Sequence, residues 1–98
     1  MKGLEPVGPI DKPGCEGLEV IGYAQDQFGT DQYYYYVAIR NNTSVTKLVG
    51  VRHIGGRTVH GRNREGSGDI TVKAGDIKKY EIDLSINPPV LFEVQRCL

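Results

Sequence analysis

The side chains best suited to catalysis or metal binding are two histidines, His53 and His60, which lie on either side of Gly55-Gly56. A glycine pair between two β-like runs predicts a tight hairpin, on which the two imidazoles would face each other. A metal ion needs a third and usually a fourth ligand, whereas the neighbours of these histidines are arginines. The pattern therefore favours two surface histidines, and we expect no metal and no other cofactor.

Catalytic patterns are missing from the sequence as well. A hydrolase requires a nucleophile, a base and an orienting acid that converge, and the chain has no G-x-S-x-G, H-E-x-x-H or phosphate-loop motif. Glu81 and Asp83 share one face of a predicted strand, which is typical of a solvated face. We therefore expect a protein without enzymatic activity.

Two cysteines, Cys15 and Cys97, lie near the two ends of the chain. They have no C-x-x-C spacing and no histidine beside them, so the pattern indicates neither a zinc site nor a redox motif. Two interpretations stay open: a disulfide between the two ends, or two unrelated thiols. A disulfide would fit an exported domain, because such bonds persist in oxidising compartments.

A run of four tyrosines followed by Val37 and Ile39 gives the strongest strand signal, within Gln32–Asn42. Successive side chains of a strand point to opposite faces. The face that includes the two branched residues is expected in the core, and its members are Tyr33, Tyr35, Val37 and Ile39. The other face is expected to reach water, and its members are Tyr34, Tyr36, Ala38 and Arg40.

Three candidate binding surfaces follow. The first is Tyr34 and Tyr36, supported by Arg40, because exposed tyrosines offer contact area at low entropic cost. The competing interpretation packs these rings against neighbouring strands or under the amino-terminal arm. The second is a set of arginines that suits phosphate, sulfate or carboxylate groups, or else forms a solvated loop tip: Arg52, Arg57, Arg62 and Arg64. The third is an exposed sheet edge, which can accept an added strand.

The charge distribution bears on the second surface. The net charge of the 98-residue chain is zero, which argues against bulk attraction to nucleic acid or anionic membrane. Residues 32–64, however, contain six basic side chains and no acidic one. Acidic segments elsewhere can neutralise this block on folding, or it can form a basic face.

The remaining elements also read as short strands, at 18–24, 45–54, 57–62, 69–73, 77–84 and from Val90 onward. Thirteen glycines and five prolines are spread along the chain, which is typical of many strands joined by turns. Asn63–Gly68 reads as an exposed loop. No segment has the apolar period of an amphipathic helix. The pattern predicts an all-β protein, a seven-stranded antiparallel β-sandwich of immunoglobulin-like type over residues 18–98, with residues 1–17 as a flexible arm or linker.

This arrangement has a consequence for the cysteines. If seven strands run alternately up and down, the first and last are parallel, and Cys15 and Cys97 begin at opposite ends of the sheet, ~17–20 Å apart. A disulfide needs Cα atoms within about 7 Å. A Cys15–Cys97 bond would therefore mean that the strand number or order differs, or that the arm folds back.

Two stretches carry a resemblance to a known class of domain. Tyr35–Ser44 resembles the second strand and following turn of bacterial immunoglobulin-like and fibronectin III-like modules, and Thr71–Asp76 with Tyr80–Leu84 looks like their later turn and strand. The likeness covers about two-thirds of the chain. The chain departs from antibody-type domains in having no tryptophan and no cysteine pair on the central strands. The resemblance implies a module of an exported or surface protein.

These observations lead to three functional hypotheses. The first is a non-catalytic protein-binding module of an exported or cell-surface assembly, which uses the tyrosine-bearing face or an edge strand. The second is a binder of polyanions (glycan or nucleic acid) through the basic hairpin 52–64, and the third is a structural spacer. No apolar run reaches the roughly 20 residues of a membrane span, and the first residues lack a signal-peptide pattern. We expect a periplasmic or extracellular location with the leader removed from this sequence.

Overall fold

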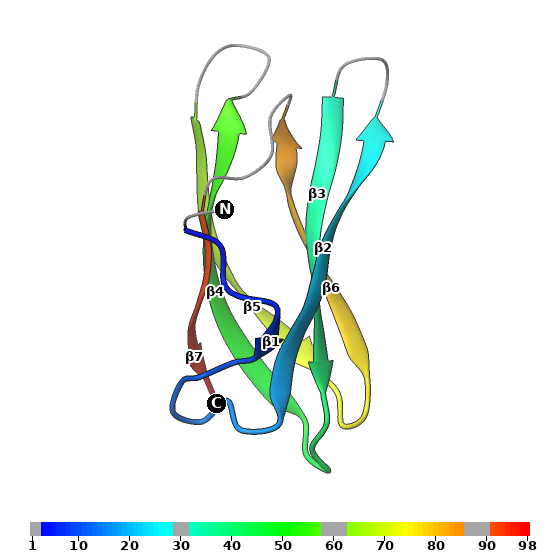
Figure 1. Ribbon diagram of the computed structural model, residues 1–98, viewed down its shortest axis with the longest axis vertical. Helices are drawn as coiled ribbons and strands as arrows, with labels where there is room; N and C mark the ends of the chain where they lie inside the picture. The colour runs from blue at the N-terminus through cyan, green and yellow to red at the C-terminus, as the bar shows by residue number, and fades with distance from the viewer. Residues whose placement is uncertain (1–2, 29–31, 58–62, 86–90) are drawn as a thin grey trace.

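A computed structural model describes residues 3–28, 32–57, 63–85 and 91–98; at 27–28, 32–34, 55–57, 63–65 and 82–85 it describes the backbone only. The described chain is all-β, with seven strands in two antiparallel sheets (Figure 1). The strands are β1 (Gly8–Pro9), β2 (Leu18–Phe28), β3 (Gln32–Asn41), β4 (Lys47–Arg57), β5 (Asn63–Val72), β6 (Ile77–Ser85) and β7 (Leu91–Cys97). One sheet has the order β1-β2-β3-β6 and the other the order β5-β4-β7.

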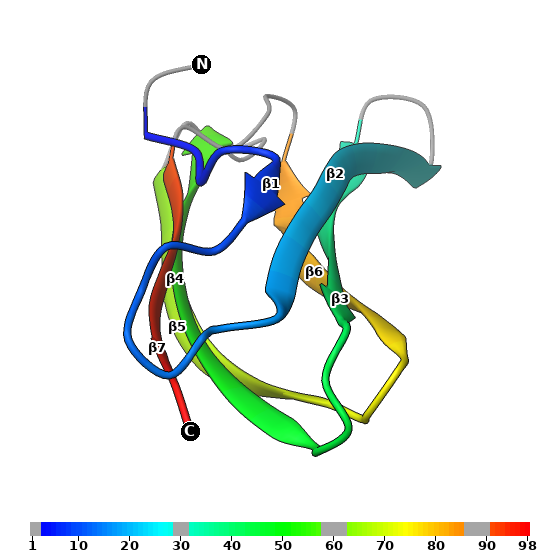
Figure 2. The same ribbon diagram turned by 60° about the horizontal axis from the view of Figure 1, so that its bottom comes forward.

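The two sheets face each other (Figure 2), and the buried side chains between them form one hydrophobic core. The alternation predicted for the tyrosine strand is confirmed where side chains are described: Tyr35, Val37 and Ile39 are buried, and Arg40 is exposed. Branched side chains on the long strands meet between the sheets because every second residue of each strand points inward. The core members from the other strands include Leu18, Val20, Val49, Val51, Ile70, Val72, Phe92 and Val94.

The expected turn at Gly55-Gly56 and the expected loop at Asn63–Gly68 are both wrong. β4 continues through the glycine pair, with Gly55 opposite Arg64, and β5 begins at Asn63. At Gly66 packing accounts for the glycine, because a Cβ there would lie 2.8 Å from Cε1 of His53. The predicted strand 57–62 therefore reduces to the end of β4 at Arg57, and residues 58–62 lie outside the described residues.

Because β4 runs through the glycine pair, the number of strands between the cysteines is smaller than expected. Six strands, β2 to β7, separate Cys15 from Cys97. They alternate in direction, so the start of β2 and the finish of β7 lie at the same end of the molecule (Figure 1). The two cysteines form a disulfide there, with Cα atoms 5.1 Å apart. The parity argument from the sequence holds: the described part of residues 18–98 forms six strands where seven were expected, and the seventh strand of the structure, β1, lies in the arm.

The strand order differs from that of immunoglobulin constant-type domains. In those domains the first, second, fifth and fourth strands form one sheet, and the third, sixth and seventh form the other. Here the second and third strands pair directly along Leu18–Phe28 and Gln32–Asn41, and the fourth strand is the centre of the other sheet. The structure thus shows two antiparallel sheets and does not confirm the immunoglobulin-like order.

Candidate functional site

The outer face of the β1-β2-β3-β6 sheet presents one described aromatic ring, that of Tyr36. Because Tyr35 and Val37 point into the core, the intervening Tyr36 points outward. Its register partners are Ala24 on β2 and Glu81 on β6. We define the tyrosine face as the outward positions Gly22, Ala24, Tyr36, Ala38, Lys79 and Glu81.

Small residues make most of the floor of this face. Gly22 and Ala38 are register partners, and Ala24 lies opposite Tyr36. Side chains of this size rise little above the sheet, so the half-buried Tyr36 ring is the main apolar feature beside them. A flat floor with one ring on it suits contact with another surface rather than enclosure of a small molecule.

The Tyr36 ring is in contact with a cation. The Lys79 ammonium lies over the ring, 4.8 Å from its centroid, which is a cation–π contact. Lys79 is itself exposed. The contact therefore gives the Tyr36 ring a neighbour on the outer face of the sheet.

Arg40 lies at one end of the same sheet in a small polar cluster. Its Nη1 is 3.2 Å from Oε1 of Glu19, and the Asn42 amide donates to the same oxygen at 3.1 Å. Arg40 is thus already paired with a carboxylate of the same sheet. The backbone of Tyr34 lies in β3 opposite Asp26, while its side chain lies outside the described residues.

His53 corrects the expectation of two surface histidines. It is only 6% exposed, because it continues the inward alternation of Val49 and Val51 along β4. Its Nδ1 lies 3.0 Å from the hydroxyl of Tyr80 on β6, so this hydrogen bond links the two sheets. The in-phase apolar residues were the signal in the sequence, and the predicted glycine turn obscured it. His60 lies outside the described residues.

The four arginines of the basic hairpin are placed unequally. Arg52 is half-buried, and its Nη1 is 3.2 Å from Oε1 of Glu93 on β7. The backbones of Arg57 and Arg64 come close together at one end of the β4–β5 pair, where their register partners are Asn63 and Gly55. Their side chains, and all of Arg62, lie outside the described residues. The structure therefore separates Arg52 from the two strand-end arginines.

The sheet edges form two contrasting sides. On one side, β1 pairs with the edge of β2, and residues 3–5 run along the edge of β7. There the Glu5 amide donates to the carbonyl of Phe92, and the Phe92 amide donates to the carbonyl of Gly3. On the other side, β5 and β6 each pair with one neighbour among the described strands. We call these the covered side and the open side.

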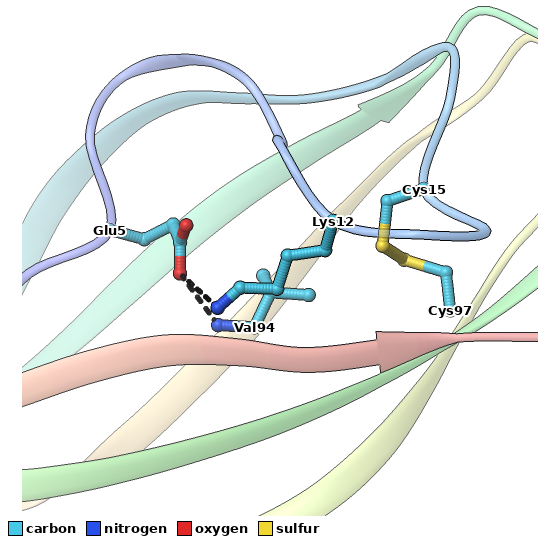
Figure 3. Close-up of a disulfide and its surroundings, with 5 residues drawn as sticks. All are labelled: Glu5, Lys12, Cys15, Val94 and Cys97. Atoms are coloured by element: carbon cyan, nitrogen blue, oxygen red, sulfur yellow. Dashed lines mark hydrogen bonds and ion pairs between the residues drawn. A yellow bond between two sulfur atoms is a disulfide. The ribbon is translucent and has the colours of Figure 1, made fainter.

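The amino-terminal arm (residues 3–17) is anchored on the covered side at several points (Figure 3). The Glu5 carboxylate accepts a hydrogen bond of 2.8 Å from the Val94 amide, and Lys12 approaches the same oxygen at 3.8 Å. The Tyr23 hydroxyl donates to the Glu5 carbonyl at 2.7 Å. Burial, with a smaller effect of the Glu5 charge, raises the pKa of Tyr23 from 10.0 to about 12. The sequence suggested a flexible linker here, whereas these contacts make the arm part of the domain.

Glycine permits the last turn of the arm. Gly14 has φ +82°, and a Cβ there would lie 2.6 Å from the carbonyl oxygen of Cys97. A side chain at this position would separate the arm from β7. The glycine therefore lets Cys15, which is fully buried, reach its partner.

Within residues 3–28, 32–57, 63–85 and 91–98, no group of three or more histidine, cysteine or acidic side chains could hold a metal ion. The same residues contain no helix with the length and hydropathy needed to cross a bilayer. The chain matches no protein-family model, and no curated protein or solved structure shows significant similarity to it.

Proposed function

We propose that this domain is a non-catalytic protein-binding module of an exported or cell-surface assembly, built as a β-sandwich, and that the tyrosine face is its binding surface. The observation that carries the proposal is the Tyr36 ring, outward on a floor of small residues and in contact with Lys79 at 4.8 Å. A tyrosine loses little conformational entropy on contact, and its ring supplies a large amphipathic area.

The disulfide supports the location outside the cytoplasm. Cys15 and Cys97 are both buried and bonded, and disulfides persist in secreted, periplasmic and surface proteins but are rare in reducing compartments. The resemblance of the turns to those of bacterial surface modules points to the same location.

Site-specific photocrosslinking tests the proposal. A photoreactive amino acid at Ala24, next to Tyr36, should give a discrete crosslinked product in cells of the source organism, and Tyr36→Ala should remove that product. The same amino acid at Thr71, exposed on the other sheet, is the matched control and should give none. Products that are identical at both positions, or that survive Tyr36→Ala, would exclude the tyrosine face.

One observation favours polyanion binding as a second candidate function. The register of β4 and β5 brings the backbones of Arg57 and Arg64 to one end of the strand pair, and arginine is a residue suited to binding phosphate or sulfate. Serine at Arg57, Arg62 and Arg64 should then abolish retention on heparin without lowering the melting temperature. Retention should also fall steeply with salt because counterions are released. Wild-type protein that passes through heparin at low salt would exclude this function.

A further inference from the structure

We propose that two copies of this chain pair through the open edge of β6, antiparallel and centred on Tyr80, to form a dimer with one continuous sheet. The pairing uses the backbone edge of β6, and the two charges that set its register, Lys79 and Glu81, also belong to the tyrosine face. The pairing needs only that edge and those charges, so it does not rest on the proposed function.

β6 is an edge strand, paired on one side among the described strands. β6 pairs with β3 from Arg40–Ile77 to Tyr33–Ser85, and no other described strand pairs with it. Backbone amides and carbonyls on the outer edge of such a strand can bond a further strand. At the opposite edge of the same sheet, β1 covers Glu19 and Val20 of β2 and ends in Pro9, a residue without an amide hydrogen.

The charges along β6 select its own copy as the partner. Lys79 and Glu81 are both exposed, on the same outward face, and they flank Tyr80. In an antiparallel pair centred on Tyr80, Lys79 of each copy stands directly opposite Glu81 of the other. Such positions have Cβ atoms about 4.5–5.5 Å apart, close enough for opposite charges to attract. The two-fold symmetry repeats the pair, so the edge is complementary to itself.

Neither charge is used for an ion pair within the described residues. Lys79 contacts the Tyr36 ring, and the described ion pairs involve other side chains, such as Glu19 with Arg40 and Arg52 with Glu93. A lysine on an edge strand by itself keeps strands apart. Glu81, two positions after Lys79 on the same face, turns this repulsion into attraction, but only in the register centred on Tyr80.

The neighbouring open edge, that of β5, lacks this property. Its outward described residues are Ser67, Asp69 and Thr71, which include an acid but no base. An antiparallel pair of β5 edges would gain no comparable attraction. The charge pattern therefore assigns the interface to β6, and the dimer joins two four-stranded sheets with both Tyr36 rings on the same outer face.

Charge reversal tests the pairing in sedimentation velocity experiments at low salt. Wild-type protein should form a dimer as its concentration rises. Lys79→Glu and Glu81→Lys should each weaken the dimer by about tenfold or more, because each places like charges opposite one another twice. An equal mixture of the two variants should form a heterodimer at least as tight as the wild-type dimer, because every opposite pair is attractive again.

Arg96→Glu, a charge reversal at an exposed position on β7, is the matched control and should leave the dimer unchanged. Hydrogen exchange gives a second readout, since the amides of residues 78–82 should become more protected with rising concentration. The proposal is overturned if the wild-type protein stays monomeric up to about 1 mM, a concentration well above the dissociation constants of stable dimers. A mixture that fails to restore association, or single variants that dimerise as the wild type does, would also overturn it.

Discussion

The two sides of this domain close the space between the same two sheets by different means. On the covered side, the arm lies along β7, and a disulfide fixes Cys15 to Cys97. On the open side, the hydrogen bond of 3.0 Å between His53 and Tyr80 joins β4 to β6, and the sheet edges carry charged and polar side chains. The covered side is closed by the amino-terminal arm and a covalent bond. The open side is held by contacts between side chains, and its β6 edge can pair with a second copy of the chain. The covered side should therefore dominate stability, and the open side should dominate association.

Removing the disulfide should have the largest effect on stability. The bond spans 82 residues, and the loop-entropy relation for that span gives about 4.5 kcal/mol. Cys15→Ala with Cys97→Ala should lower the free energy of unfolding in denaturant by an amount of this order. A loss below about 1 kcal/mol would mean that the covered side does not depend on its covalent bond.

The core between the two sides gives the next largest effect. Tyr35 is 7% exposed, and truncation of a buried aromatic residue costs about 4 kcal/mol. Tyr36→Ala, next to it on the outward face, should cost less than about 1.5 kcal/mol. Equal losses at the two positions in denaturant unfolding would contradict the facing of β3.

A methyl group at Gly66 should strain the open side. The added Cβ would meet the His53 ring at 2.8 Å, and overpacking of this kind costs about 1–3 kcal/mol. Ala at Ser67, the next residue and exposed, is the control and should change the melting temperature little. A Gly66→Ala variant as mild as Ser67→Ala would contradict the close packing of the His53 ring on Gly66.

The smallest effect should come from Tyr23→Phe on the covered side. It removes the 2.7 Å hydrogen bond to Glu5, at a cost of about 1 kcal/mol. The pKa of Tyr23 is raised to about 12 from 10.0, so the fold favours the neutral phenol. Its contribution is complete below pH 10 and is lost as the pH rises through about 12.

The difference in unfolding free energy between wild type and Tyr23→Phe, measured from pH 8 to 12, isolates this tyrosine from the others. The difference should shrink at the alkaline end of the series. A difference that stays constant across the series would mean that the hydroxyl does not titrate with the fold.

Alternation along the strands predicted most of the interior. Each strand side chain has two choices, and branched residues such as Val37 and Ile39 decide between them locally. The burial of Tyr35, Ile70, Val72 and Phe92 follows from that rule. The all-β fold class could also be predicted from the sequence, because the apolar residues lack the helical period of about 3.6 and show the strand period of two.

Glycine caused the errors, because its local preference is ambiguous. Gly55-Gly56 and Gly66 are compatible with a turn, but they lie in strands, and at Gly66 the ring of a residue on the partner strand requires the missing side chain. That requirement arises between residues 13 positions apart and has no local signature. The same misreading added a strand, which hid both the buried His53 and the shared end of the two cysteines.

Which strands pair with one another could not be predicted from the sequence. Sheet order depends on which edges meet after the chain has crossed between layers, and patterns within single strands do not encode it. The site shows the same limit: the sequence placed Tyr36 on an outward face, but its contact with Lys79 requires β6 to lie beside β3.

The bond between Cys15 and Cys97 also determines how this domain carries mechanical load. Tension applied outside the two cysteines passes from one sulfur to the other, and the strands between them bear none of it. A pull on the two ends should therefore peel the arm before Cys15 and then stop, because the 82-residue separation can add no length. Reduction of the bond would make about 280 Å of extended chain available under force. Under oxidising conditions the domain is a short, inextensible link.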